Sequence, residues 1–180
     1  MCFDQFKLHH IGFDVELTRA VVDGKLEPAL EAIVDYDAAA NWPWPFIYKE
    51  INETYADCQF ILTVRRDSQT WMRSLKSQAK KRPHSLYREW VYGCQDPVGH
   101  ERELMRKYEQ HNENVRNYFA NESGKLLQVC WDTGSDWRGI CEFLDQPIPT
   151  TPFPHANRSA RRKENLLSRL YSRVGLPRAA

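Results

Sequence analysis

The sequence predicts one α/β domain built on a parallel sheet that helices flank, and three observations predict it. Phe60 to Val64 is an almost unbroken apolar run, typical of a strand covered on both faces. Lys125 to Trp131 holds a second such run. Between them, apolar residues recur every three or four positions from Glu101 to Phe119, which predicts an amphipathic helix. Strands that alternate with helices of this length favour a layered α/β fold over a helical bundle.

The amino-terminal third predicts shorter elements ahead of the first long strand. In chain order we expect a helix over Phe3–Phe13, a helix over Leu26–Val34, a brief strand over Val34–Ala38 and a helix over Phe46–Tyr55. Gly12 is the expected stop of the first helix, and Pro28 fits the first turn of the second. The last helix is predicted by an apolar stripe at helical spacing, and it follows the turn NWPWP.

The rest of the chain predicts capped helices, a proline-rich loop and a basic tail. We expect a helix capped by Asp67 or Ser68 with Trp71, Leu75 and Gln78 inward, and a short helix capped by Ser135 or Asp136 that ends near Leu144. The segment QPIPTTPFPH is expected to lack regular structure, because proline has no amide hydrogen to donate. We therefore divide the chain into a domain over residues 1–158 and a basic helical tail over residues 159–180.

The composition of the chain indicates which kinds of partner are not expected. The formal net charge is +1, so nothing in the overall charge predicts nucleic acid or an anionic membrane as a partner. Five scattered cysteines form no C-x-x-C pair and no His/Cys cluster with zinc-ligand spacing, so no metal is implied. The chain has neither an apolar run of about 18 residues nor the pattern of a signal peptide at its start. We expect a cytoplasmic protein without firm membrane association, and the sequence gives no indication of its oligomeric state.

An arginine pair at the end of the first long strand predicts a local anion site. Arg65 and Arg66 follow Val64, where ligands of open parallel sheets bind. The next helix would point free backbone N–H groups into the same space, and guanidinium groups match phosphate oxygens. Ser74, two turns into that helix, can add a hydroxyl. The alternative is that one arginine pairs with Asp67 or another surface carboxylate and that Ser74 is an ordinary helix residue.

The stretch FILTVRRDSQTWMRS resembles the 3′-phosphate-binding motif of sulfotransferases, which transfer the sulfuryl group of 3′-phosphoadenosine 5′-phosphosulfate (PAPS). The segments HNENVRNYF, KLLQV and PFPHAN resemble later parts of the same family in the same order, so the likeness covers most of residues 3–158. It implies a three-layer parallel sheet flanked by helices, similar to P-loop nucleoside triphosphate hydrolases. It also implies that Arg66 and Ser74 hold the 3′-phosphate of PAPS, with Arg65 as a second candidate.

Two features depart from the family pattern. Members of the family have a glycine-rich loop that wraps the 5′-phosphosulfate, but no such loop occurs in these 180 residues, and Met1 falls about where it should finish. The resemblance therefore implies an N-terminally incomplete domain. Asn41 stands where the family commonly has an aspartate suited to act as general base, and a carboxamide cannot take that role. Asp37 is then the candidate base, although it also reads as an ordinary strand-end carboxylate.

Three readings of function follow. In the first, the chain transfers a sulfuryl group from PAPS to the hydroxyl or amine of a small-molecule acceptor that the sequence does not identify. In the second, it is a catalytically inactive module that binds the nucleotide or a protein partner. In the third, it is a fragment of a longer enzyme whose glycine-rich loop lies upstream.

Overall fold

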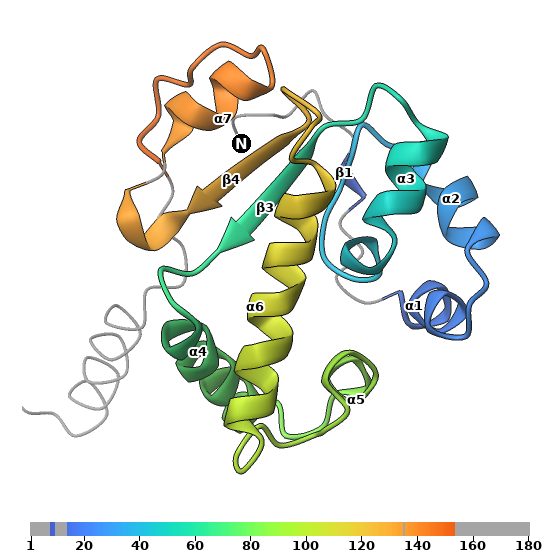
Figure 1. Ribbon diagram of the computed structural model, residues 1–180, viewed down its shortest axis with the longest axis vertical. Helices are drawn as coiled ribbons and strands as arrows, with labels where there is room; N and C mark the ends of the chain where they lie inside the picture. The colour runs from blue at the N-terminus through green and yellow to red at the C-terminus, as the bar shows by residue number, and fades with distance from the viewer. Residues whose placement is uncertain (1–7, 10–13, 135, 154–180) are drawn as a thin grey trace, which may run out of the picture. The chain divides into compact units, whose positions relative to one another are not determined.

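The computed structural model describes residues 8–9, 14–134 and 136–153. They fall in two compact units, Met1–Ile148 and Pro149–Ala180, and every helix and strand described lies in the first unit. Figure 1 shows this unit, with labels on its seven α-helices and on β1, β3 and β4. The described elements in chain order are β1 (Leu8–His9), α1 (Val15–Val22), α2 (Glu27–Ile33), β2 (Ala38–Ala39), the 3₁₀ helix η1 (Trp44–Phe46), α3 (Tyr48–Thr54), β3 (Phe60–Val64), α4 (Ser68–Lys81), α5 (Leu86–Tyr92), α6 (Glu101–Tyr118), β4 (Leu126–Cys130), the 3₁₀ helix η2 (Trp131–Thr133) and α7 (Trp137–Phe143).

The first strand pair lies near the start of the unit. β1 pairs with β2 in parallel, Leu8 opposite Ala38 and His9 opposite Ala39. The brief strand predicted over residues 34–38 therefore exists, but it is shifted toward Ala39. The helix expected over residues 3–13 is wrong at residues 8–9, and the rest of that range lies outside the described residues. A short isolated helix is marginal in water, and pairing with β2 supplies backbone hydrogen bonds instead.

Two helices of the structure were not predicted from the sequence. α1 begins after Asp14, whose carboxylate accepts a hydrogen bond of 2.8 Å from the Leu17 N–H. α5 begins after Ser85, whose hydroxyl accepts from the Arg88 N–H, and it ends at Gly93 in the left-handed conformation with φ of 77°. Both follow the usual rules for helix caps, namely a short polar side chain before the first turn and, for α5, glycine after the last.

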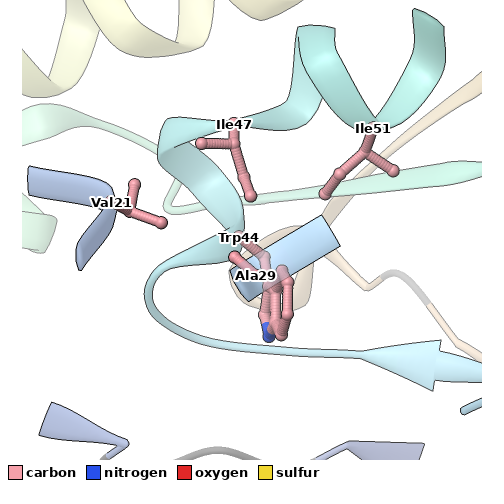
Figure 2. Packing of buried hydrophobic residues seen from close by; sticks show 5 residues of the cluster. All are labelled: Val21, Ala29, Trp44, Ile47 and Ile51. Atoms are coloured by element: carbon pink, nitrogen blue, oxygen red, sulfur yellow. The ribbon is translucent and has the colours of Figure 1, made fainter. Parts of the chain in front are cut away.

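One core cluster joins α1, α2, η1 and α3. Figure 2 shows Trp44 beside Ala29, with Ile47 and Ile51 on the neighbouring turns and Val21 of α1 completing the group. All five are buried. The apolar stripe predicted for residues 46–55 is confirmed in part: Ile47 and Ile51 face the core at helical spacing, whereas Phe46, in the 3₁₀ turn before α3, is 40% exposed.

The second strand pair forms the other sheet. β3 has the predicted bounds and pairs with β4 in parallel, from Phe60 opposite Leu126 to Val64 opposite Cys130 (Figure 1). Leu62 packs on Val115 and Phe119, at the carboxyl end of α6. The opposite face is less covered than predicted, since Ile61 is 39% exposed. The expectation of burial on both faces is wrong because α6 covers only the face to which alternate residues of β3 point.

α4 and α6 pack against each other beyond the end of β3. Met72 and Leu75 of α4 contact Leu104 of α6, which is almost fully buried. Asp67 is the cap of α4, as predicted, and its carboxylate accepts from the Thr70 N–H at 2.5 Å. Gln78 is exposed, contrary to expectation. The buried stripe instead runs through Met72, Leu75 and Ala79, at steps of three and four residues.

The last described elements agree with the sequence. α7 is capped by Asp136 and ends before Leu144, and residues 146–153 hold neither helix nor strand. The basic helical tail predicted over residues 159–180 lies outside the described residues, and so does the boundary at residue 158. The strands described form two separate two-stranded sheets, so the chain is shown to be mixed α/β with small parallel sheets. None of the described helices combines the length and apolar character needed to cross a membrane.

Candidate functional site

The carboxyl ends of β3 and β4 bring two arginines and an aspartate together. Arg65 and Arg66 follow β3, and Asp132 lies in η2, directly after β4. The Arg65 guanidinium pairs with the Asp132 carboxylate at 2.7 Å between Nε and Oδ2. The same oxygen accepts the backbone N–H of Arg66 at 3.2 Å. Because Val64 lies opposite Cys130 in the parallel register, residues just past the two strands meet at one edge.

Tyr108 connects this edge of the β3–β4 sheet to the helices α4 and α6. Its hydroxyl oxygen accepts the backbone N–H of Arg65 at 2.8 Å. Its ring stacks on Trp71 with centroids 4.5 Å apart and planes 12° from parallel. Trp71 lies in α4 and Tyr108 in α6, so the backbone that carries both arginines is fixed between two packed helices.

The first two turns of α4 gather the other polar groups around Thr70. The Thr70 hydroxyl oxygen accepts from Arg66 Nε at 3.2 Å and from Arg73 Nη2 at 2.8 Å. The Ser74 hydroxyl donates to the Thr70 carbonyl oxygen at 3.2 Å. Thr70 is itself buried, whereas the three side chains that bond to it are exposed or only partly covered. Arg66 and Ser74, the two predicted phosphate ligands, are therefore both attached to one buried residue.

Two carboxylates partly neutralise the guanidinium groups. Arg66 Nε lies 3.3 Å from Asp67 Oδ2, in addition to the pairing of Arg65 with Asp132. Hydrogen bonds from the Thr70 side chain and backbone lower the pKa of the Asp67 carboxyl, and the charges of Arg66 and Arg73 lower it further. Three guanidinium groups thus face two carboxylates, which leaves a local excess of positive charge at the amino end of α4. An incoming phosphate would be attracted by this excess and by the helix terminus.

The structure brings Arg66 and Ser74 together through Thr70, and it directs Arg65 to Asp132. Both arginines carry aspartate partners, which is the arrangement that the alternative interpretation expected. The sequence analysis missed Thr70, Asp132 and Tyr108 as members of this cluster. Asp132 could have been found, because it lies just past the second apolar strand, as the arginine pair lies just past the first.

The candidate base lies by another strand. Asp37 is exposed and directly precedes β2, at the strand's amino end. Asn41 lies two residues past the carboxyl end of β2, with a positive φ of 70°, and the following Trp42–Pro43 peptide bond is cis. Ligands of parallel sheets bind beyond carboxyl ends, which favours the position of Asn41 over that of Asp37. The role of Asp37 stays a prediction.

Known proteins resemble this chain over most of its length. The sequence pattern of the sulfotransferase domain matches residues 14–97 and 82–162, which together span more than four fifths of the chain. The Ava biosynthesis cluster protein M of Aspergillus versicolor is 25% identical over 180 aligned positions, which cover 83% of this chain and 67% of that protein. The matched region contains the arginine pair, the whole of α4, Asp132 and the turn at Asn41. The chain therefore belongs to the sulfotransferase domain family.

Proposed function

We propose that the chain acts as a sulfotransferase with PAPS as the donor and a small molecule as the acceptor. In the reaction an acceptor oxygen or nitrogen attacks sulfur in line, the bond between sulfur and the bridging phosphate oxygen breaks, and adenosine 3′,5′-bisphosphate leaves. The acceptor's proton passes to a base. The observation that carries the proposal is the attachment of Arg66 and Ser74 to Thr70 at the start of α4, within the family match.

The donor set around Thr70 fits a nucleotide 3′-phosphate. Arg66 and Arg73 offer guanidinium N–H groups, and Ser74 offers a hydroxyl whose present partner is only a backbone carbonyl. A dianionic phosphate is a stronger acceptor than that carbonyl, so the Ser74 hydroxyl can turn to it. The same phosphate would compete with Asp67 for Arg66, whose side chain is 56% exposed and free to reorient. Charge-assisted bonds of this kind contribute about 1.5–3 kcal/mol each.

Arg65 has a supporting part in this proposal. Its guanidinium is held by Asp132 and its backbone N–H by Tyr108. We assign it the task of fixing the strand end next to the phosphate, with a direct contact to the nucleotide as a second possibility. The aspartate keeps the charge of Arg65 balanced, so it contributes less to the local attraction of anions than Arg66 does.

The reaction also needs a side chain that takes the proton of the acceptor group. Asp37 is proposed as the base, since Asn41 cannot serve. General base catalysis is worth about 10²–10⁴-fold. An Asp37→Asn variant should therefore lose at least a hundredfold in turnover while nucleotide affinity stays unchanged. An unaltered rate would exclude Asp37 from the chemistry.

We also propose that β1–β2 and β3–β4 belong to one three-layer, P-loop-like sheet in a cytoplasmic protein. Both pairs are parallel, as such a sheet requires. Among the described residues, Cys58 and Cys94 are free thiols, which suits a reducing compartment.

A second function is favoured by Asn41, namely nucleotide binding without transfer. Calorimetry with adenosine 3′,5′-bisphosphate beside a transfer assay with ³⁵S-labelled PAPS and a panel of hydroxyl and amine acceptors separates the two. Binding together with transfer supports the enzyme. Binding with no transfer to any acceptor supports the module, and absence of binding contradicts both.

A further inference from the structure

An open pocket of about 320 Å³ lies away from the arginine cluster, among α1, α3 and α5. Its walls come from Val21, Leu26, Phe46, Ile47 and Trp90, all apolar, with Glu50 as the one ionisable side chain that lines it. Figure 2 shows two of the lining residues, Val21 and Ile47, which also belong to the core cluster of α1, α2, η1 and α3. The volume is at the small end of ligand pockets, which run from about 300 to 1,000 Å³.

Glu50 is the unusual member of the lining. Its Oε2 atom is buried and has no hydrogen-bond partner among the described residues. The Glu50 carboxylate also stands beside apolar walls in the pocket lining, where a cationic partner is favourable because water is partly excluded. The neighbouring walls are hydrocarbon and aromatic surfaces, and the indole N–H of Trp90 is the one side-chain donor in the lining.

We propose that this pocket binds a small hydrophobic molecule that carries a protonated amine, with Glu50 as the counter-ion of that amine. The apolar walls select a ring or a short branched skeleton, since its burial is favourable in proportion to its apolar area. The carboxylate selects an ammonium group over a neutral hydroxyl, because a charge-assisted hydrogen bond is the stronger one. Trp90 and Phe46 add aromatic surface against which a ring can pack.

One lining residue of the pocket, Phe46, also contacts the turn that holds Asn41. The ring of Phe46 packs on that of Trp42 with centroids 4.8 Å apart, and Trp42 is the residue after Asn41. Where the proposed sulfotransferase function holds, and the inference rests on it at this point, the bound molecule is the acceptor: its ammonium group is held by Glu50, and a hydroxyl elsewhere on the same molecule attacks sulfur and passes its proton to the base. Glu50 is then the residue that determines acceptor specificity.

The test compares 2-phenylethylamine with 2-phenylethanol, which has the same skeleton and no charge. Binding is measured by calorimetry and by NMR shifts of the Val21 and Ile47 methyl groups, in the whole chain and in Glu50→Gln. Glu53→Gln is the matched control, since Glu53 is exposed on the same helix and absent from the pocket lining. Glu50→Gln should keep the fold, because the Thr54 hydroxyl donates to the backbone carbonyl of Glu50 and not to its side chain, and circular dichroism checks this.

We expect the amine to bind the wild type and Glu53→Gln equally, to shift both methyl groups, and to bind Glu50→Gln at least tenfold more weakly. The affinity for the alcohol should not change in Glu50→Gln. Equal affinity of the amine for wild type and Glu50→Gln, or no methyl shift at millimolar amine, overturns the proposal.

Calorimetry with adenosine 3′,5′-bisphosphate distinguishes a failure of the pocket proposal from a failure of the proposed sulfotransferase function. Nucleotide binding without amine binding overturns the pocket alone, and amine binding without nucleotide binding supports the pocket while removing its role as acceptor site.

Discussion

At the start of α4 one hydroxyl group, that of Thr70, accepts hydrogen bonds from the guanidinium groups of both Arg66 and Arg73. Its carbonyl oxygen also accepts from the Ser74 hydroxyl. Thr70 is buried in a helix, so its own side chain is already ordered. It can therefore hold three exposed polar side chains with little further loss of its conformational freedom. In the proposed site it is a positioning residue, because it does not itself contact the nucleotide.

A Thr70→Val variant tests this role. Valine keeps the shape but removes the acceptor, so Arg66 and Arg73 lose their common anchor. We expect the affinity for adenosine 3′,5′-bisphosphate to fall by about 1–2 kcal/mol and the affinity for adenosine 5′-monophosphate to change little. Thr63→Val, at an exposed position of β3, is the control and should leave both affinities unchanged. Equal losses for the two nucleotides in Thr70→Val would contradict a specific link to the 3′-phosphate.

The buried His111 should make the free energy of unfolding depend on pH. Burial lowers its pKa below the ordinary value of about 6.5, and its ring lies edge-on to Tyr48 with centroids 6.2 Å apart. As the pH falls below 6.5, the unfolded chain binds a proton that the folded chain does not, so stability falls with pH. A His111→Gln variant should show a smaller fall between pH 7 and pH 5 in urea unfolding. An identical fall in wild type and variant would show that His111 is not responsible.

Residue by residue, the sequence allowed part of this site to be predicted. Arg66 and Ser74 could be proposed because their types and spacing follow a family motif. Thr70 could not, because its importance comes from two side chains that meet on it only when the helix is formed. Asp132 was missed because it lies 67 residues after Arg65, and only the parallel register of β3 and β4 brings the two together.

Among the elements, α5 depends on one buried arginine. Arg88 is 5% exposed, and its guanidinium donates to the carbonyl oxygens of Gln95 at 2.8 Å and Pro83 at 2.7 Å, and also to that of Arg82. These carbonyls belong to the segments on either side of α5. The charge is therefore satisfied by backbone rather than by a carboxylate, and it holds both connections of the helix in place.

Replacing Arg88 by Met should destabilise this region. The apolar chain is kept, but three carbonyl oxygens lose their donor, so the free energy of unfolding should fall by about 2–4 kcal/mol. Arg102→Met, at an exposed position of α6, should change it by less than about 0.5 kcal/mol. Urea unfolding measures both. A similar small effect in the two variants would mean that the Arg88 bonds contribute nothing to stability.

The elements that were predicted correctly are those with a long, regular pattern. α6 and β3 have unambiguous helical and strand patterns, and their bounds agree with the structure to within one residue. α1 and α5 are too short to establish a period, and their caps, Asp14 and Ser85, were not used to predict them, whereas the equally short α2 and α7 were predicted from Pro28 and from the cap at Asp136. The exposure of Ile61 could not be foreseen, since an apolar strand does not say how many of its faces are covered.

At the scale of the whole molecule, our proposal places the strand pairs β1–β2 and β3–β4 in one sheet. The pattern of the sequence predicted parallel strands, and the described strands are parallel. Whether they join into one sheet depends on contacts between residues far apart in the chain, which local patterns do not encode. Our proposal of a three-layer sheet predicts that a crystal structure will show β2 and β3 connected through a strand between them. Two pairs with no intervening strand would contradict it.

The central claim is that Arg66 binds a nucleotide 3′-phosphate, and calorimetry on the whole chain tests it most directly. Wild type should bind adenosine 3′,5′-bisphosphate more tightly than adenosine 5′-monophosphate by about 1.5–3 kcal/mol. Arg66→Ala should remove most of that difference, and Arg19→Ala, which deletes a guanidinium from the exposed Arg19–Asp23 pair of α1, should preserve it. The same difference in Arg66→Ala as in wild type would contradict the account.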